Sequence, residues 1–258
     1  MKRRDVILGG GVLLGAAALG WSQRNALTGL VLKNRTNEGV VLTDALGVGQ
    51  PSCVLTADQV EGPFFLKAPM RSNIREDRKG LALDLAFQIV NAKSCKPIEG
   101  AGVEVWHCDA AGRYSGYPED LARKPFDTLA LLMRHGGPDA HVPHVNDKTY
   151  LRGAQLSGAN GMVRFQTILP GWYEPRVTHI HVKVITGTET QLSTQLYFSD
   201  EFLVDVYGNH PDYKPYDLSP YKAENDLAFI AEPNGQGLML HPRQTADGIA
   251  ATCKLGIA

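Results

Sequence analysis

Apolar residues alternate with mixed ones along several short stretches of the chain, which is the pattern of a strand with one buried face. From Leu81 to Ile89, every odd-numbered residue is apolar. Residues 102–107 (GVEVWH) form a second such stretch, and we expect these two strands to pair antiparallel. Later strands are predicted at 179–184 (HIHVKV), 191–198 (QLSTQLYF) and 237–243 (GLMLHPR).

Turn and capping residues separate these stretches. The pair Asn160-Gly161 has the chemistry of a two-residue hairpin turn and lies between the apolar segments 150–156 and 162–169. Many short strands, frequent turns and few helices predict an all-β fold, namely an antiparallel β-sandwich with long loops and a few short helices. The expected helix caps are Asp127, before a helix over 128–135, and the pairs Ser199-Asp200 and Ser219-Pro220.

The N-terminal part of the chain differs from the rest. Three basic residues at positions 2–4 precede an apolar run over 6–21, and the Arg-Arg pair indicates twin-arginine export to the periplasm or beyond. The run is shorter than the roughly 20 apolar residues of a stable membrane span, so a cleaved signal and an uncleaved membrane anchor both stay open. We assign residues 1–25 to this signal or anchor, 26–52 to a linker and 53–258 to one folded domain.

The net charge of the chain bears on which macromolecules it could bind. The chain has 258 residues and a formal net charge of −1. A charge so close to zero argues against nucleic acid or an anionic membrane surface as a partner. Glycine and proline are spread along the whole chain, as expected for many short strands joined by turns.

The cysteines Cys53, Cys95, Cys108 and Cys253 would permit two disulfides in an exported protein. The chain has no CxxC pair, so a zinc site made of thiolates is not expected. Cys95 and Cys108 are poor partners if the stretch between them is a strand, because its ends would lie too far apart. The choice among the three pairings stays open, as does the alternative that some thiols are simply small buried side chains.

Two histidines in the strand at 179–184 suggest a metal site. Because side chains alternate along a strand, His179 and His181 point to the same face, with Cα atoms roughly 7 Å apart. The opposite face carries Ile180, Val182 and Val184 and would join the core. A His-X-His pair can equally be two polar positions on a solvated sheet face.

Two tyrosines strengthen the metal hypothesis. Tyr114 follows the strand at 102–107, and Tyr173 follows a Pro-Gly-Trp turn just before the histidine strand. Two phenolates and two imidazoles favour a trivalent, oxophilic ion such as Fe(III) over Zn(II) or Cu(I). A high ionic charge also lowers the pKa of a coordinated phenol far below its free value of about 10.

The chain resembles the intradiol ring-cleavage dioxygenases, the family that includes catechol and protocatechuate dioxygenases, and within it the exported single-chain branch. The resemblance covers about residues 53–202, in order. Its most specific part is the combination GRY, PGWY and R-X-X-HIH. The matching segments are TADQVEGPFF, CKPIEGAGVEVWHCDAAGRYSGY, YLRGAQLSGANGMVRFQTILPGWYEPRVTHIHVKV and TQLYFSDE.

This resemblance implies a cofactor, substrates and roles for individual residues. Fe(III) would be the cofactor, with a catecholic ring and O2 as substrates and a cis,cis-muconate-type diacid as product. Tyr173 would also act as the base that accepts a catechol proton. Arg176 would stabilise negative charge on the ring, and Gln195 would line the same pocket. The implied iron ligands are Tyr114, Tyr173, His179 and His181.

Several alternatives stay open. The same site could act on a larger substituted catechol or on hydroxyquinol, or the protein could be an exported β-sandwich binding module with Zn(II) at the histidine pair. The segment 118–148 could be a flap over the pocket or a surface loop. Its histidines, His135, His141 and His144, could hold a second metal or be solvated, and His107 receives no role.

Overall fold

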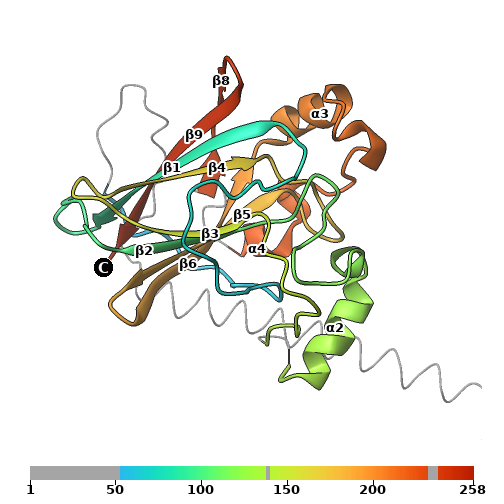
Figure 1. Cartoon of the computed structure of the whole chain (residues 1–258), viewed down its shortest axis with the longest axis horizontal. Coiled ribbons are helices and arrows are strands. Elements are labelled where there is room, and N and C mark those ends of the chain that lie inside the picture. The colour runs from blue at the N-terminus through green and yellow to red at the C-terminus, as the bar shows by residue number, and fades with distance from the viewer. Residues whose placement is uncertain (1–52, 138–139, 232–237) are drawn as a thin grey trace, which may run out of the picture.

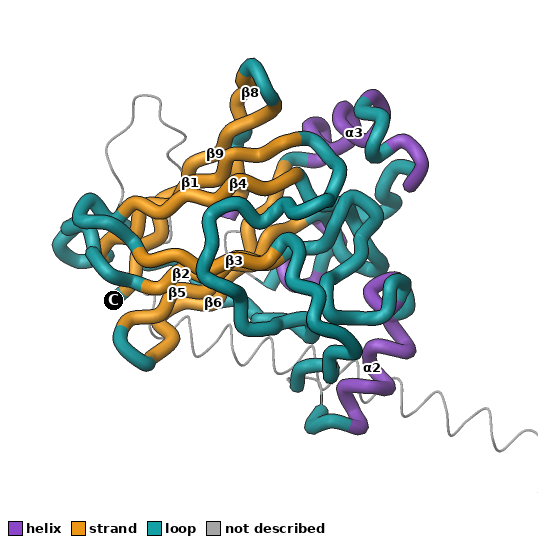
Figure 2. Tube along the Cα trace, viewed as in Figure 1, coloured by secondary structure: helices purple, strands orange, loops and turns teal. Residues whose placement is uncertain are grey.

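The computed structural model describes residues 53–137, 140–231 and 238–258. Two β-sheets pack face to face, while helices and long loops gather at one end of the strands (Figures 1 and 2). The segments predicted as a signal or anchor (1–25) and a linker (26–52) lie outside the described residues. No helix within the described ranges has the length and apolar character needed to cross a membrane.

The two sheets confirm the predicted β-sandwich. Both are mixed, because β1 pairs with β9 and β6 pairs with β7 in parallel, while the other pairs are antiparallel. The first sheet has the order β4 (Met162–Ile168), β1 (Ala82–Asn91), β9 (Gly248–Ile257) and β8 (Arg243–Thr245). The second has the order β3 (Arg152–Leu156), β2 (Gly102–Trp106), β5 (His179–Thr186), β6 (Glu189–Phe198) and β7 (Met239–Leu240).

The predicted pairing of the first two strands is wrong. β1 has β4 and β9 on its two edges, whereas β2 lies in the other sheet between β3 and β5. The predicted late strand at 237–243 is divided between β7 and β8, and these lie in different sheets. The long C-terminal strand β9, which sequence analysis missed, occupies the edge of β1.

The turn at Asn160-Gly161 exists, but it does not form a hairpin. It connects β3 to β4, and these strands belong to different sheets. The carbonyl of Gly161 accepts a hydrogen bond from the Ile89 amide at 2.9 Å, which holds the turn against the end of β1. A Cβ at position 161 would lie 2.4 Å from the Ile89 carbonyl oxygen, so the glycine is required for this close approach.

The helices begin at different residues than the sequence indicated, with one exception. The Ser199 side chain caps its helix as predicted, by accepting a hydrogen bond from the Phe202 amide. Asp127 is not a cap, because its helix already begins at Pro125. No helix begins at Ser219, whose hydroxyl instead bonds the backbone of Tyr221. The described residues form the helices α2 (Pro125–Arg134), α3 (Asp200–Asn209), α4 (Leu227–Ile230) and the 3-10 turns η1 (Leu121–Arg123), η2 (Lys214–Tyr216) and η3 (Ala223–Asn225).

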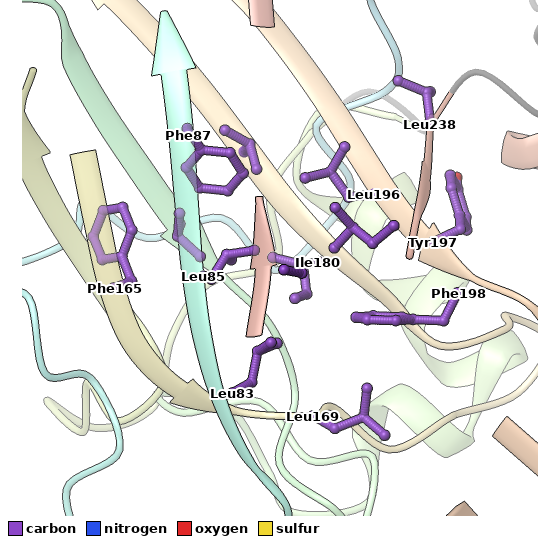
Figure 3. Close-up of a cluster of buried hydrophobic side chains, with 14 of the residues drawn as sticks. Leu83, Leu85, Phe87, Phe165, Leu169, Ile180, Leu196, Tyr197, Phe198 and Leu238 are labelled. Atoms are coloured by element: carbon purple, nitrogen blue, oxygen red, sulfur yellow. The ribbon is translucent and has the colours of Figure 1, made fainter. Parts of the chain in front are cut away.

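The main core lies between the two sheets. Alternate residues of β1 point into it, and Figure 3 shows Leu83, Leu85 and Phe87 opposite Ile180 of β5 and Leu196 of β6. All five of these side chains are at most 1% exposed. Since Ile180 faces the core, its neighbours on β5 must project from the outer face of the second sheet.

An N-terminal strap, defined as residues 53–66, crosses from the first sheet to the outer face of the second. A disulfide between Cys53 and Cys95 ties its start to the connection between β1 and β2. The Thr56 amide then bonds the Gly256 carbonyl at 2.8 Å. The other two cysteines are free thiols, so one disulfide forms of the two that the sequence permits, and its pairing avoids Cys108.

Candidate active site

The four predicted metal ligands converge at one point on the outer face of the second sheet. Nε2 of His179 lies 3.1 Å from Nε2 of His181 and 3.1 Å from the hydroxyl oxygen of Tyr173. The hydroxyl oxygens of Tyr173 and Tyr114 are 3.5 Å apart. Each of the four side chains is at most 5% exposed. Two nitrogen and two oxygen donors are therefore gathered in one buried cluster.

Strand β5 supplies both histidines, and two different interactions orient their rings. Nδ1 of His179 lies 2.6 Å from the carbonyl oxygen of Val177, so Nδ1 carries the proton and Nε2 presents a lone pair. The ring of His181 stacks on the buried indole of Trp106, with centroids 4.8 Å apart and planes 6° apart. Nδ1 of His181 has no hydrogen-bond partner among the described residues, so packing orients this second ring.

The two tyrosines come from separate loops, one after β2 and one between β4 and β5. A glycine allows the backbones of these two loops to approach closely. Gly112 has a φ of +77°, and a Cβ there would lie 2.3 Å from the carbonyl oxygen of Trp172, next to Tyr173. Phe64 of the N-terminal strap stacks on the ring of Tyr114 at a centroid distance of 4.7 Å.

Burial determines the charge of these four groups. It raises the pKa of Tyr173 to about 12 and raises the pKa of Tyr114 well above its usual range. It lowers the pKa values of His179 and His181 well below their usual range. All four side chains are therefore neutral by themselves at physiological pH. A cation of high charge reverses the effect of burial on a phenol, because it stabilises the phenolate directly.

The donor set fits a ferric ion. Phenolate oxygen and imidazole nitrogen are ligands that an oxophilic trivalent ion accepts. Thiolate and carboxylate do not contribute, since residues 53–137, 140–231 and 238–258 contain no group of three His, Cys, Asp or Glu that could hold a metal. The histidines that were considered for a second metal, His135, His141 and His144, are exposed and form no such group within the same described residues.

Arg176 and Gln195, the other two predicted site residues, lie beside this cluster and contact each other. Nη2 of Arg176 donates to Oε1 of Gln195 at 2.5 Å, and Gln195 pairs across β5 and β6 with His181. Nε2 of Gln195 donates to the carbonyl of Val60 in the N-terminal strap at 2.8 Å. The structure thus brings all six predicted residues into one site.

Sequence analysis missed several residues of this site. Gly62 lies over His181, and a Cβ there would be 3.2 Å from Cε1 of that ring. Trp106 ends β2 and stacks on the same ring. Asp226 is completely buried and bonds Arg176. Its place just before α4 is the one signal that could have revealed it, because Asp is a preferred helix cap.

The segment 118–148, left open as a flap or a surface loop, packs against the site where it is described. Leu121, Leu132 and Val142 share an apolar cluster with Tyr114 and Tyr173. The Val142 amide also bonds the carbonyl of Pro63 in the N-terminal strap at 3.0 Å. The described part of this segment is therefore a wall beside the tyrosines.

His107 has a structural position. It is fully buried, and its ring nitrogens lie 2.7 Å from Oγ1 of Thr167 and 2.8 Å from the carbonyl oxygen of Cys108. Burial lowers its pKa to about 4. A neutral, fully bonded imidazole joins β2 to β4 here, and the four donors do not involve it.

Comparisons with known proteins establish the family of the chain. Residues 60–208 match the family model described as Dioxygenase. Chlorocatechol 1,2-dioxygenase of Rhodococcus opacus is 24% identical over 176 residues, which are 58% of this chain and 59% of that protein. The chain thus spans less than two thirds of that curated relative's length.

Solved structures give the same family. An intradiol ring-cleavage dioxygenase from Tetranychus urticae matches with a TM-score of 0.67 and 28% identity, over 80% of this chain and 94% of that one. Catechol 1,2-dioxygenase from Acinetobacter sp. ADP1 matches in fold, with a TM-score of 0.57 and 18% identity, over 100% of this chain and 79% of that one. From its matched residues and its fold, the chain belongs to the intradiol ring-cleavage dioxygenase family.

Proposed function

We propose that this protein is a non-haem Fe(III) intradiol dioxygenase, which inserts both atoms of O2 into a catecholic ring and yields a cis,cis-muconate-type diacid. One observation carries the proposal: the donor atoms of Tyr114, Tyr173, His179 and His181 meet in one buried cluster. Membership in the intradiol family supports it.

Tyr114, Tyr173, His179 and His181 would hold the iron. When bound, ferric iron would act as a Lewis acid that withdraws electron density from a catecholate and makes its ring reactive toward O2. As iron ligands both phenols would be deprotonated, so iron uptake would release protons and rising pH would favour it. His179 is already in the required tautomer, because its Nδ1 donates to Val177.

Tyr173 is the residue that would move a proton. Its hydroxyl oxygen lies at the junction of the cluster, 3.1 Å from His179 and 3.5 Å from Tyr114. As a phenolate it would accept the proton of a catechol hydroxyl at this oxygen, which is general base catalysis. Its neighbour in the same loop, Arg176, then supplies positive charge for the catecholate oxygen.

The surrounding aromatic residues would exclude water from the reaction. Phe64, Trp106 and Tyr117 are each at most 4% exposed and pack against the donor cluster. A dry site strengthens the attraction between Arg176 and negative charge on the substrate. The relatives' names identify chlorocatechol and catechol as their substrates, so we infer a catechol, substituted or not, for this protein.

We also propose that the protein is exported. The basic residues at 2–4 and the apolar run at 6–21 support this, as does the disulfide between Cys53 and Cys95, because disulfides persist in oxidising compartments. Fractionation of cells that express the full chain tests the proposal. Replacing Arg3 and Arg4 with lysine should retain the protein in the cytoplasm, whereas unchanged export would exclude the twin-arginine route.

The activity itself is tested by oxygen uptake with a panel of catechols, followed by mass analysis of the product. The proposal expects one O2 consumed per catechol and, from isotopically labelled O2, both labelled atoms in a ring-opened diacid. An iron-loaded protein that consumes no O2 with any catechol, or that releases an aldehyde-bearing product, would contradict the proposal. The rates of O2 uptake across the panel also show whether a hydroxyquinol or another substituted catechol is the preferred substrate.

A further inference from the structure

Asp226 is a fully buried carboxylate whose two oxygens have different partners. Oδ1 accepts hydrogen bonds from the amides of Ala228 and Phe229 at 3.0 and 3.2 Å, which caps α4. Oδ2 accepts from Nε of Arg176 at 2.8 Å and from the Val177 amide at 3.0 Å. One carboxylate oxygen therefore caps the helix, and the other binds Arg176 and Val177 at the site.

The bond to Asp226 fixes the orientation of the Arg176 guanidinium. Nε is held by Asp226, while Nη2 donates to Gln195 at 2.5 Å and lies 3.4 Å from the hydroxyl of Tyr197. Nη1 has no hydrogen-bond partner among the described residues and is not among their fully buried unpaired atoms. One edge of the guanidinium is thus clamped, and Nη1 is left to donate to a ligand.

The same carboxylate also supports the turn that leads to the metal cluster. It bonds the Val177 amide, and the Val177 carbonyl is the acceptor for Nδ1 of His179. Burial disfavours an isolated guanidinium, but the charge of the Asp226 carboxylate is the largest of the effects that oppose burial, and together with the nearby Tyr173 and Tyr197 it raises the pKa of Arg176. The arginine keeps its charge inside the protein because this partner is beside it.

We propose that Asp226 is a positioning residue of the reaction: it holds the Arg176 guanidinium so that Nη1 faces the bound substrate. This inference rests on the proposed function, because it assigns a task to Arg176 in that reaction. Asp226 lies beyond residues 60–208, so it belongs to a part of the chain that the family match does not include. The C-terminal segment thereby takes part in the site.

Two substitutions separate positioning from capping. Asp226→Asn keeps the size of the side chain but removes its charge. Asp226→Ser keeps a good cap for α4, yet its hydroxyl is too short to reach Nε of Arg176. In the iron-loaded protein both variants should lose about 100-fold in kcat with a smaller change in KM. The reason is that a correctly placed guanidinium stabilises mainly the transition state, and this stabilisation is lost when the group is misplaced.

A double-mutant cycle tests whether Asp226 acts through Arg176. Once Arg176→Gln is present, adding Asp226→Asn should change kcat by less than about twofold. The matched control is Asp200→Asn, since Asp200 bonds the Ala223 amide in the same C-terminal segment and does not touch Arg176. This control should keep the wild-type kcat. If the loss of kcat in the double variant equals the product of the losses in Asp226→Asn and Arg176→Gln, the two residues act independently and the inference is overturned.

Two readouts do not depend on turnover. The unfolding free energies of the metal-free variants should show coupling between positions 176 and 226, and iron content with its visible absorption band should be unchanged in Asp226→Asn. If the wild type cleaves catechols and Asp226→Ser retains its kcat, this inference alone fails. If the wild type cleaves no catechol while the unfolding energies are coupled, the proposed function fails, and the positioning role fails with it.

Discussion

Nε2 of His179 lies 3.1 Å from Nε2 of His181. His179 presents a lone pair there, because its Nδ1 donates to the Val177 carbonyl. Nδ1 of His181, by contrast, has no hydrogen-bond partner among the described residues, so no hydrogen bond at Nδ1 fixes this ring as the Val177 carbonyl fixes that of His179. The orientation of His181 thus depends on its stacking neighbours.

Substitution of Gly62 tests this dependence. In Gly62→Ala the new methyl group would lie 3.2 Å from Cε1 of His181, so the ring must shift by a few tenths of an ångström. The φ of +82° adds a cost of about 1–2 kcal/mol in stability. We expect the variant to retain less iron through a dialysis series against a chelator.

The control for this experiment is Gly187→Ala. Gly187 has a φ of +61°, and a Cβ there would meet no atom within 4 Å. This variant should lose a similar amount of stability while retaining iron like the wild type. Equal iron retention in the two variants would show that the N-terminal strap does not determine the position of His181.

The disulfide between Cys53 and Cys95 should account for a large part of the protein's stability. The two cysteines are 42 residues apart, and the chain-entropy estimate for such a loop is about 4 kcal/mol. Cys53→Ser should lower the free energy of unfolding in urea by about this amount. Adding a reductant should bring the wild type to the level of the variant and leave the variant unchanged. A wild type that is insensitive to reductant would contradict the expectation.

Glu104 predicts a pH dependence of stability. This residue of β2 is 7% exposed, and its Oε2 has no hydrogen-bond partner among the described residues. Burial raises its pKa above 4.5, although Lys183 on the neighbouring strand opposes the shift. The folded protein therefore binds this proton more tightly than the unfolded chain does. Stability from this group is present at low pH and declines as the pH rises through the folded pKa.

Glu104→Gln removes this titration. The free energy of unfolding of the wild type, relative to the variant, should fall as the pH is raised from about 4 toward neutrality. Urea unfolding of both proteins at a series of pH values measures the difference. A difference that stays constant across this range would show that Glu104 ionises inside the folded protein without cost.

Local pattern was sufficient to predict most of the strands of the two sheets, β9 excepted, but not their partners. The alternating apolar residues of β1 and β5 were recognised because each strand needs one face in the core. One of the two neighbours of β1 is β9, which begins at Gly248, near the other end of the chain. A local pattern carries no signal for such a pairing, so β2 was the expected partner. The Asn160-Gly161 turn was misread for the same reason.

The site shows the same division between local and distant information. Strand alternation alone brings His179 and His181 to one face, and the two tyrosines were proposed as ligands from their donor chemistry, whereas Arg176 and Gln195 were found through the family resemblance. Asp226 was missed because its partner Arg176 lies 50 residues earlier, and only the fold brings the two together. The contact of Gly62 with His181 is equally invisible in the sequence.

The most direct test of the central claim is titration of the metal-depleted protein with Fe(III), followed by visible absorption. Tyrosinate bound to ferric iron gives a charge-transfer band, so the wild type should take up one iron and become coloured. Tyr114→Phe and Tyr173→Phe should each weaken or shift the band, whereas Tyr117→Phe, which removes a neighbouring buried hydroxyl that donates to the Phe65 carbonyl, should keep it. A colourless iron-bound protein, or a band that survives the loss of both Tyr114 and Tyr173, would contradict the account.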